Sequence, residues 1–132
     1  MWQVLFEPER GLLTVRLSGH VALQDVRDLA EAHARALEAT GAAPFRVLVD
    51  ARGLVPLEPE AVLWLGAMKR VAAEQPGFRG VAVLADSATV LMQQHRVRLS
   101  RASPGSDGGG LELVTLDEAE ALRFVRASTA DR

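Results

Sequence analysis

The sequence contains no cysteine, no tyrosine and no isoleucine, and Lys69 is the single lysine among its 15 basic residues. Without cysteine the chain cannot form a disulfide, a zinc–thiolate site or a thiol nucleophile. No apolar run approaches the roughly 18 residues of a transmembrane helix, so we predict no membrane span. The 17 acidic residues outnumber the basic ones and the net charge is −2. Domains that bind the nucleic acid backbone usually have a basic excess, so we expect no nucleic acid partner.

The residues that are present are typical of one globular domain. The chain has 132 residues, of which 48% are hydrophobic and 24% charged. A chain of this length buries enough surface to form a core without disulfides or metals. We therefore expect a single domain over residues 1–132, with a frayed tail over about 128–132. The first residues lack the basic-then-apolar pattern of a signal peptide, which favours a cytoplasmic location.

Alternating apolar residues predict an antiparallel hairpin at the start of the chain. The segments 2–6 and 12–18 alternate with period two and flank a short turn that contains Gly11. In the second segment, we expect Leu13, Val15 and Leu17 to point inward and Thr14, Arg16 and Ser18 to point outward. The hairpin is therefore expected to have one face open to solvent.

The rest of the chain alternates helical and strand patterns. Continuous apolar runs over 45–50 and 81–85 are typical of strands buried on both sides in a parallel sheet. A fifth strand is expected over 111–116, and the helices are expected over 22–40, 59–74, 87–101 and 117–127. The order β-β-α-β-α-β-α-β-α predicts an α/β fold in which a mixed sheet is flanked by helices.

Several strings within this order resemble the SpoIIAA-like family, which has the STAS fold of anti-sigma-factor antagonists. The strings are RGLLTVRLSGHVALQDV, FRVLVDARGL, VAVLADS and DEAEALRFV, and they span nearly the whole chain. The resemblance implies a STAS-like mixed sheet that starts with an antiparallel hairpin and continues in βα units. It also implies a regulatory or ligand-binding module rather than an enzyme.

One stretch departs from the pattern of that family. Switchable antagonists carry a phosphorylatable serine just before their second long helix. The equivalent stretch here, residues 55–60, is VPLEPE and contains no hydroxyl group. The resemblance therefore implies a member without the phospho-serine switch.

Polar residues follow two of the buried strands and define a possible ligand crevice. Asp50 and Asp86 come directly after these strands, with Arg52 and Ser87 beside them. Ligands of open α/β sheets bind beyond the carboxyl ends of the strands. The alternative is structural: Asp86 or Ser87 caps the following helix, and the Asp50 side chain organises a turn.

The helix over 59–74 is apolar on more than one side. Its core side is expected to comprise Ala61, Trp64, Leu65, Met68 and Ala72. The opposite side carries Val62, Leu63, Gly66 and Arg70, and we predict that these four residues bind a partner. The alternative is that a neighbouring loop or helix buries this side.

No constellation of catalytic or metal-binding residues is visible. The three histidines, His20, His33 and His95, are isolated in sequence and are expected to be half-buried structural residues. The glycine-rich segment 103–110 lacks the pattern of a phosphate-binding loop and is expected to be a flexible connector. We therefore predict no enzyme, no cofactor and no structural metal.

The helix over 87–101 carries the one locally basic face of the chain. Its residues are Gln94, Arg96, Arg98 and Arg101. This face is expected to be an ordinary solvated surface, with contact to an acidic partner as the alternative.

Two functional hypotheses follow from the sequence. The first is a non-catalytic STAS-like module that binds a protein partner or a second copy of itself. The second is a carrier for a small apolar or lipid-like ligand, because STAS-like domains resemble CRAL-TRIO lipid carriers in architecture. The second hypothesis requires an interior cavity large enough for such a ligand.

Overall fold

The computed structural model describes residues 1–99 and 112–126. Its elements are β1 (Trp2–Glu7), a 3-10 turn η1 (Pro8–Arg10), β2 (Leu12–Leu17), α1 (Leu23–Thr40), β3 (Phe45–Ala51), α2 (Pro59–Ala73), β4 (Phe78–Ala85), α3 (Ala88–Arg96), β5 (Glu112–Thr115) and α4 (Glu118–Arg126). This order of strands and helices confirms the predicted one. The connector expected over 103–110 and the tail expected over 128–132 lie outside the described residues.

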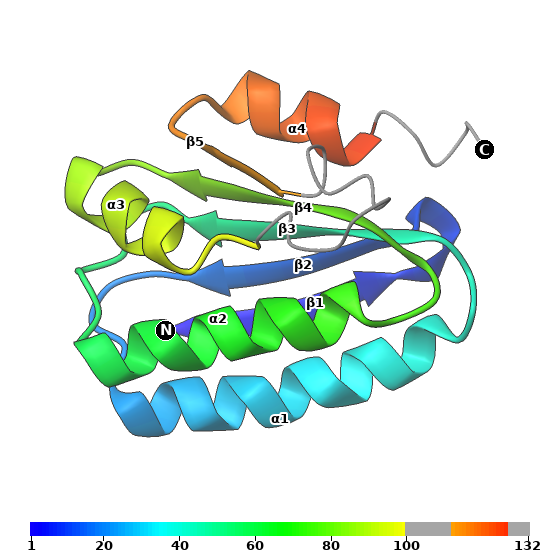
Figure 1. Cartoon of the computed structure of the whole chain (residues 1–132), viewed down its shortest axis with the longest axis horizontal. Helices are drawn as coiled ribbons and strands as arrows, with labels where there is room; N and C mark the ends of the chain where they lie inside the picture. The colour runs from blue at the N-terminus through cyan, green and yellow to red at the C-terminus, as the bar shows by residue number, and fades with distance from the viewer. Residues whose placement is uncertain (100–111, 127–132) are drawn as a thin grey trace.

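The five strands form one mixed sheet in the order β1-β2-β3-β4-β5 (Figure 1). The pair β1–β2 is antiparallel and every other neighbouring pair is parallel. A row of valines in register crosses all the strands: Val4, Val15, Val49, Val83 and Val114. Branched side chains of this kind pack well on a pleated surface, and this row forms part of the main core.

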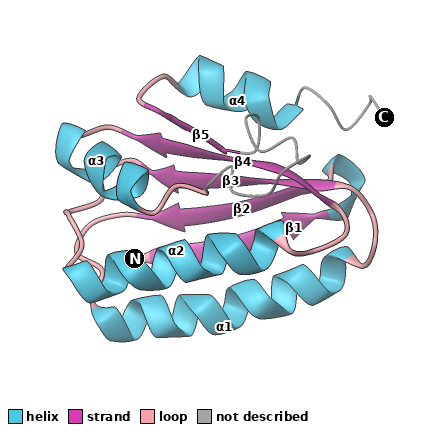
Figure 2. Cartoon of the chain, in the orientation of Figure 1, coloured by secondary structure: helices cyan, strands magenta, loops and turns pink. Residues whose placement is uncertain are grey.

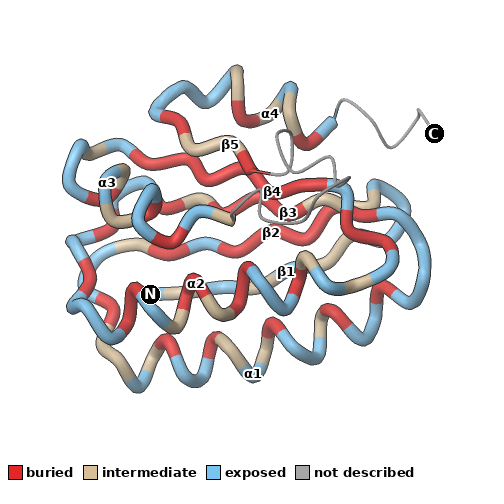
Figure 3. The backbone as a smooth tube through the Cα atoms, viewed as in Figure 1, coloured by how far each residue is buried: buried red, intermediate tan, exposed pale blue. Residues whose placement is uncertain are grey.

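Helices cover both faces of the sheet (Figures 1 and 2). The helices α1, α2 and α3 contribute to the main hydrophobic cluster on one face. On the other face, α4 packs Ala121 and Val125 in a smaller cluster with β2, β3 and β4. The central strands are therefore buried on both sides, as Figure 3 shows.

The hairpin is less open to solvent than its sequence predicts. Thr14 was expected to point into water, but it is buried. It lies on the face of the sheet that α4 partly covers, near Leu12 and Leu48 of the smaller cluster. Arg16 is exposed, as expected. The prediction of a solvated face therefore fails at Thr14, because hairpin periodicity does not show where a distant helix packs.

Helix ends follow local capping chemistry. The Asp25 carboxylate accepts a hydrogen bond from the Ala22 N–H at 2.9 Å at the start of α1, and α1 stops at Gly41, where φ is 60°. At the start of α3, the Ser87 hydroxyl accepts from the Val90 N–H at 3.2 Å. The α3 helix ends at Arg96, earlier than the predicted residue 101, because the backbone of Val97 leaves the helical conformation with φ at −112°. Val97 itself is buried.

Candidate functional site

The predicted crevice residues meet at the carboxyl ends of β3 and β4. The backbone N–H of Gly53 donates to both oxygens of the Asp86 carboxylate, each at 3.0 Å. Asp86 therefore ties the loop after β3 to the end of β4 and does not cap α3. The cap is Ser87, one of the two residues considered for that role.

Asp50 organises the turn after β3. Its carboxylate accepts from the Nε and Nη2 of Arg52, both at 2.9 Å, and from the Arg52 backbone N–H at 3.2 Å. These hydrogen bonds lower the pKa of Asp50 and raise that of Arg52. Arg52 also lies 3.4 Å from the Glu118 carboxylate of α4. All four crevice residues thus have structural contacts, and these contacts support the structural alternative. Ligand binding here stays a prediction.

A side chain of α3 and the backbone at Gly19 hold the loop between β3 and α2. Gln93 of α3 pairs with Leu57 through two hydrogen bonds, since its Oε1 accepts from the Leu57 N–H at 3.0 Å and its Nε2 donates to the Leu57 carbonyl at 2.7 Å. The Val55 N–H donates to the Gly19 carbonyl at 3.0 Å. The stretch that lacks the family's serine is therefore fixed at both Val55 and Leu57.

The predicted partner-binding side of α2 is divided by burial. Val62 is buried, and so is Gly66. A Cβ atom on Gly66 would lie 2.8 Å from the Cβ of Val97, so this glycine accommodates the segment after α3. Leu63 and Arg70 are exposed, as predicted. Val62 and Gly66 therefore do not lie on an outward surface, and at these two positions the structure agrees with the alternative of burial. Partner binding by Leu63 and Arg70 stays a prediction.

The exposed part of α2 is an apolar ridge. Leu63 has 66% of its surface exposed and Val71 has 45%. Ala67 is half-buried and lies between them at a spacing of four residues, so the three share one helix face. We call Leu63, Ala67 and Val71 the α2 ridge. Beside it, Leu63 and Ala67 line a shallow depression together with Glu60 and Trp64.

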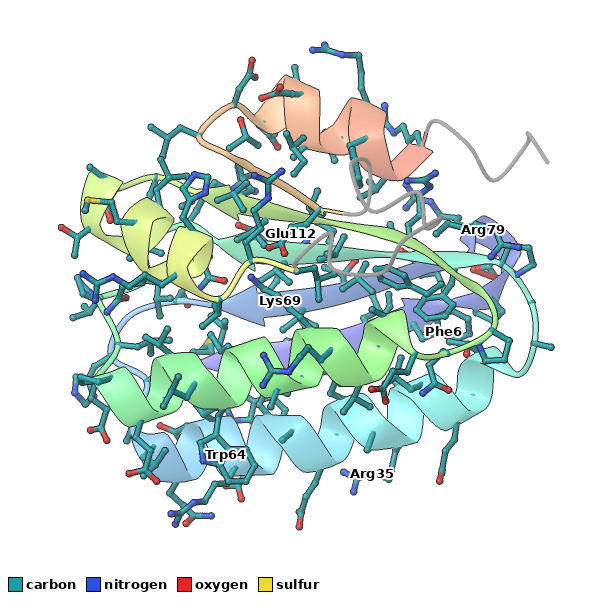
Figure 4. The ribbon with its side chains drawn as sticks, in the orientation of Figure 1. Phe6, Arg35, Trp64, Lys69, Arg79 and Glu112 are labelled. Atoms are coloured by element: carbon teal, nitrogen blue, oxygen red, sulfur yellow. The ribbon has the colours of Figure 1, made fainter. Side chains whose placement is uncertain are left out.

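Trp64 extends this surface toward α1 (Figure 4). Its indole was expected in the core, but it is half-buried and packs against the edge of the main cluster. The Arg27 guanidinium of α1 lies 6.0 Å from the centre of its ring system. Arg27 also lies 3.9 Å from the Glu60 carboxylate. The ridge is therefore flanked by an aromatic side chain and by charges of both signs.

A buried ion pair connects α2 to β5. The Nζ of Lys69 lies 2.7 Å from the Oε2 of Glu112, and Figure 4 shows the two side chains facing each other. The other oxygen, Oε1, accepts from the Leu99 N–H at 2.7 Å, and the Glu112 carbonyl accepts from Arg98 at 3.0 Å. Burial lowers the pKa of Lys69, while Glu112 acts in the opposite direction. Sequence reasoning missed this pair, although a single lysine in an apolar helix is a signal that could have prompted a search for its partner.

The histidines differ from the expected half-buried state. His33 is buried, with 4% exposure, whereas His20 and His95 are exposed. Burial lowers the pKa of His33 to about 4. The basic face of α3 is also smaller than expected: Gln94 is buried, and Arg101 lies outside the described residues.

The described residues can be compared with the needs of a metal site, a membrane span and an interior ligand cavity. Over 1–99 and 112–126, no three His, Asp or Glu side chains gather where they could hold a metal ion. None of the helices described above is both long and apolar enough to cross a membrane. A cavity of about 30 Å³ lies between α2 and the sheet. An engineered apolar cavity of about 150 Å³ binds benzene, so this one is far too small for a lipid chain. This cavity therefore gives no support to the carrier hypothesis.

Comparison with known proteins identifies the fold. No family model and no curated protein matches the sequence. An anti-sigma factor antagonist from Mycobacterium paratuberculosis has a similar structure, with a TM-score of 0.64 and 17% identity over 96% of this chain and 95% of the other. An uncharacterised protein from Shewanella loihica with a SpoIIAA-like fold matches with a TM-score of 0.61 and 14% identity over 95% and 92% of the two chains. The chain therefore has the SpoIIAA-like α/β fold that its strings resemble, shared with an anti-sigma factor antagonist.

Proposed function

We infer that the chain is a non-catalytic binding module that holds a protein partner on the α2 ridge. The structural similarity to an anti-sigma factor antagonist supports a regulatory role through protein contacts. In this proposal the module acts in the cytoplasm and binds its partner without a cofactor.

The observation that carries this function is the exposure of Leu63. It is 66% exposed on a helix whose other sides pack against the sheet, α1 and the segment after α3. One exposed leucine is ordinary, but the ridge places Ala67 and Val71 in line with it. Trp64 and Arg70 flank the ridge, and tryptophan and arginine are enriched at the centres of protein interfaces.

Binding in this proposal does not depend on phosphorylation of the loop before α2. Residues 55–60 carry no hydroxyl group. Glu58 and Glu60 lie at the N-terminus of α2, where they supply the negative charge that a helix start favours and would repel a phosphate. The contacts at Val55 and Leu57 hold the loop in one arrangement. A stoichiometric phosphorylation in this loop, found by mass spectrometry of the native protein, would contradict this part of the proposal.

The substitution Leu63→Asp tests the binding surface. The matched control is Leu116→Asp, because Leu116 is 54% exposed and lies outside the ridge. Both variants should keep their stability within about 0.5 kcal/mol, since exposed sites tolerate substitution. In affinity capture, we expect Leu63→Asp to lose a partner that both the wild-type chain and Leu116→Asp retain. Self-association is measured separately by sedimentation.

Two outcomes would overturn the proposal. If Leu63→Asp and Leu116→Asp retain the same partners as the wild-type chain, the ridge is not the contact surface. If Leu63→Asp instead loses several kcal/mol of stability, then Leu63 contributes to packing and its exposure was misjudged.

A further inference from the structure

The cavity between α2 and the sheet combines an apolar floor with three polar side chains. Its volume is about 30 Å³, and valines of β2, β3 and β4 line it from the sheet side. The helices that cover this face contribute one polar residue each: His33 from α1, Lys69 from α2 and Gln94 from α3. The cavity is separate from the α2 ridge, which faces away from the sheet.

Gln94 is the unusual member of this group. Its surface is only 1% exposed, and it is among the largest fully buried side chains. Over the described part of the chain, neither its Oε1 nor its Nε2 has a hydrogen-bond partner. An unpaired buried polar group loses its hydration without compensation, and native proteins pair nearly all such groups. Gln94 thus lines the cavity and carries one unpaired donor group and one unpaired acceptor.

The charges around the cavity balance. Burial lowers the pKa of His33 to about 4, so its imidazole is neutral at pH 7. The Lys69 ammonium is paired with the Glu112 carboxylate at 2.7 Å. A charged ligand would have no counter-ion here and would lose its hydration without compensation. The cavity therefore favours an uncharged ligand.

The size of the cavity and the hydrogen bonds that Gln94 can form restrict the class of ligand further. A water molecule requires about 10–15 Å³ of such space, so the cavity accommodates about two waters or a ligand of about three heavy atoms. We propose that this cavity is a binding site for a small primary amide, which pairs with the Gln94 side chain. The Nε2 of Gln94 donates to the ligand's carbonyl oxygen, and the Oε1 accepts from the ligand's N–H. A primary amide is complementary because it presents one acceptor and one donor on the same edge.

Formamide is the probe that tests this proposal, since it is a primary amide with three heavy atoms. It is titrated into isotope-labelled protein and followed through the backbone and side-chain amide signals in NMR spectra. We expect saturable shifts confined to the residues that line the cavity. Formate has the same number of heavy atoms but carries a charge and no N–H, so it should cause no such shifts. Xenon fills dry apolar cavities and should not bind in this one.

Two variants locate the contact. Gln94→Leu removes the amide at nearly constant volume and should weaken formamide binding about tenfold or more. Gln93→Leu is the matched control, because the amide of Gln93 is already paired with Leu57, and it should leave formamide binding unchanged. The titrations of the wild-type chain with formamide, formate and xenon test the proposal even if a variant fails to fold. Formamide shifts that never saturate, xenon binding in the cavity, or equal formamide affinity in Gln94→Leu would each overturn the proposal.

Discussion

The Lys69 ammonium and the Glu112 carboxylate lie 2.7 Å apart with side-chain exposures of only 5% and 1%, although 43 residues separate them in the sequence. The pair joins the middle of α2 to the edge strand β5. Removing two charges from water is costly, and their mutual attraction offsets this cost only when the geometry is good. Loss of one partner therefore leaves a buried charge without compensation.

We predict that Lys69→Met alone destabilises the protein by about 3–5 kcal/mol, which is a large part of the stability of a typical domain. The double variant Lys69→Met with Glu112→Gln should recover much of this loss, because no buried charge remains and the side-chain amide oxygen introduced at position 112 can still accept from the Leu99 N–H. Chemical denaturation of the wild-type chain and the three variants gives the coupling energy. Additive losses from the two single changes would show that the pair is not coupled.

We predict that His33 makes the protein less stable in mild acid. Its pKa falls from 6.5 to about 4 on folding because it is buried. Between these values the unfolded chain holds a proton that the folded chain lacks, so stability falls as the pH is lowered from about 6.5 to about 4. At the acid end of this window the loss attributable to His33 is about 3 kcal/mol.

The measurement is denaturant unfolding across this pH range. Carboxylates also titrate there, so the contribution of His33 is the difference between wild type and His33→Gln. The control for the change of residue type is His20→Gln, because His20 is exposed whereas His33 is buried. An unchanged slope in His33→Gln would mean that His33 is not held neutral by burial.

We predict that Gly66→Ala destabilises the protein, although alanine favours helices over glycine by about 1 kcal/mol. The new Cβ would meet the Cβ of Val97 at 2.8 Å and its Cγ1 at 3.0 Å. Overpacking of this kind costs about 1–3 kcal/mol. Val97→Gly removes both of these atoms, so in thermal unfolding it should be less harmful in the Gly66→Ala background than in the wild-type chain. Equal effects of Val97→Gly in both backgrounds would show that the two residues do not meet.

We predict that Gln93→Leu loosens the loop before α2 without unfolding the domain. The change removes both hydrogen bonds between Gln93 and the backbone of Leu57. Hydrogen exchange at the Leu57 amide should become faster, because local opening of the loop no longer breaks the bond to Gln93. Exchange within the central strand β3 should stay unchanged. If exchange at Leu57 stays slow in the variant, then other contacts hold the loop in place.

Much of the architecture could be predicted from short-range pattern. The valine-rich runs that became β3 and β4 have the period and composition of buried strands, and Gly41 ends α1 where a helix stop was expected. These features depend on local residues alone, so one sequence is enough to find them.

The errors concern contacts between distant segments. Val62 and Gly66 point away from the core side of α2 on a helical wheel, yet both are buried, and Val97 packs against Gly66. Thr14 alternates as a solvent-facing residue, but its face of the sheet is partly covered by α4. Glutamine is a polar residue that is usually found at the surface, and no residue near Gln94 in the sequence indicates that it lines a cavity. Helix periodicity predicts which side chains share a face of the helix. Only the packed fold shows which of these faces contacts another element.

Glu112 also has a consequence for how this protein could vary or be engineered. Its side chain accepts from the Leu99 N–H and its carbonyl accepts from Arg98, so one residue fixes the segment after α3 to the start of β5. The same carboxylate pairs with Lys69 of α2. Substitutions at Lys69 and substitutions in the segment after α3 therefore share one partner, and their effects on stability should not add independently.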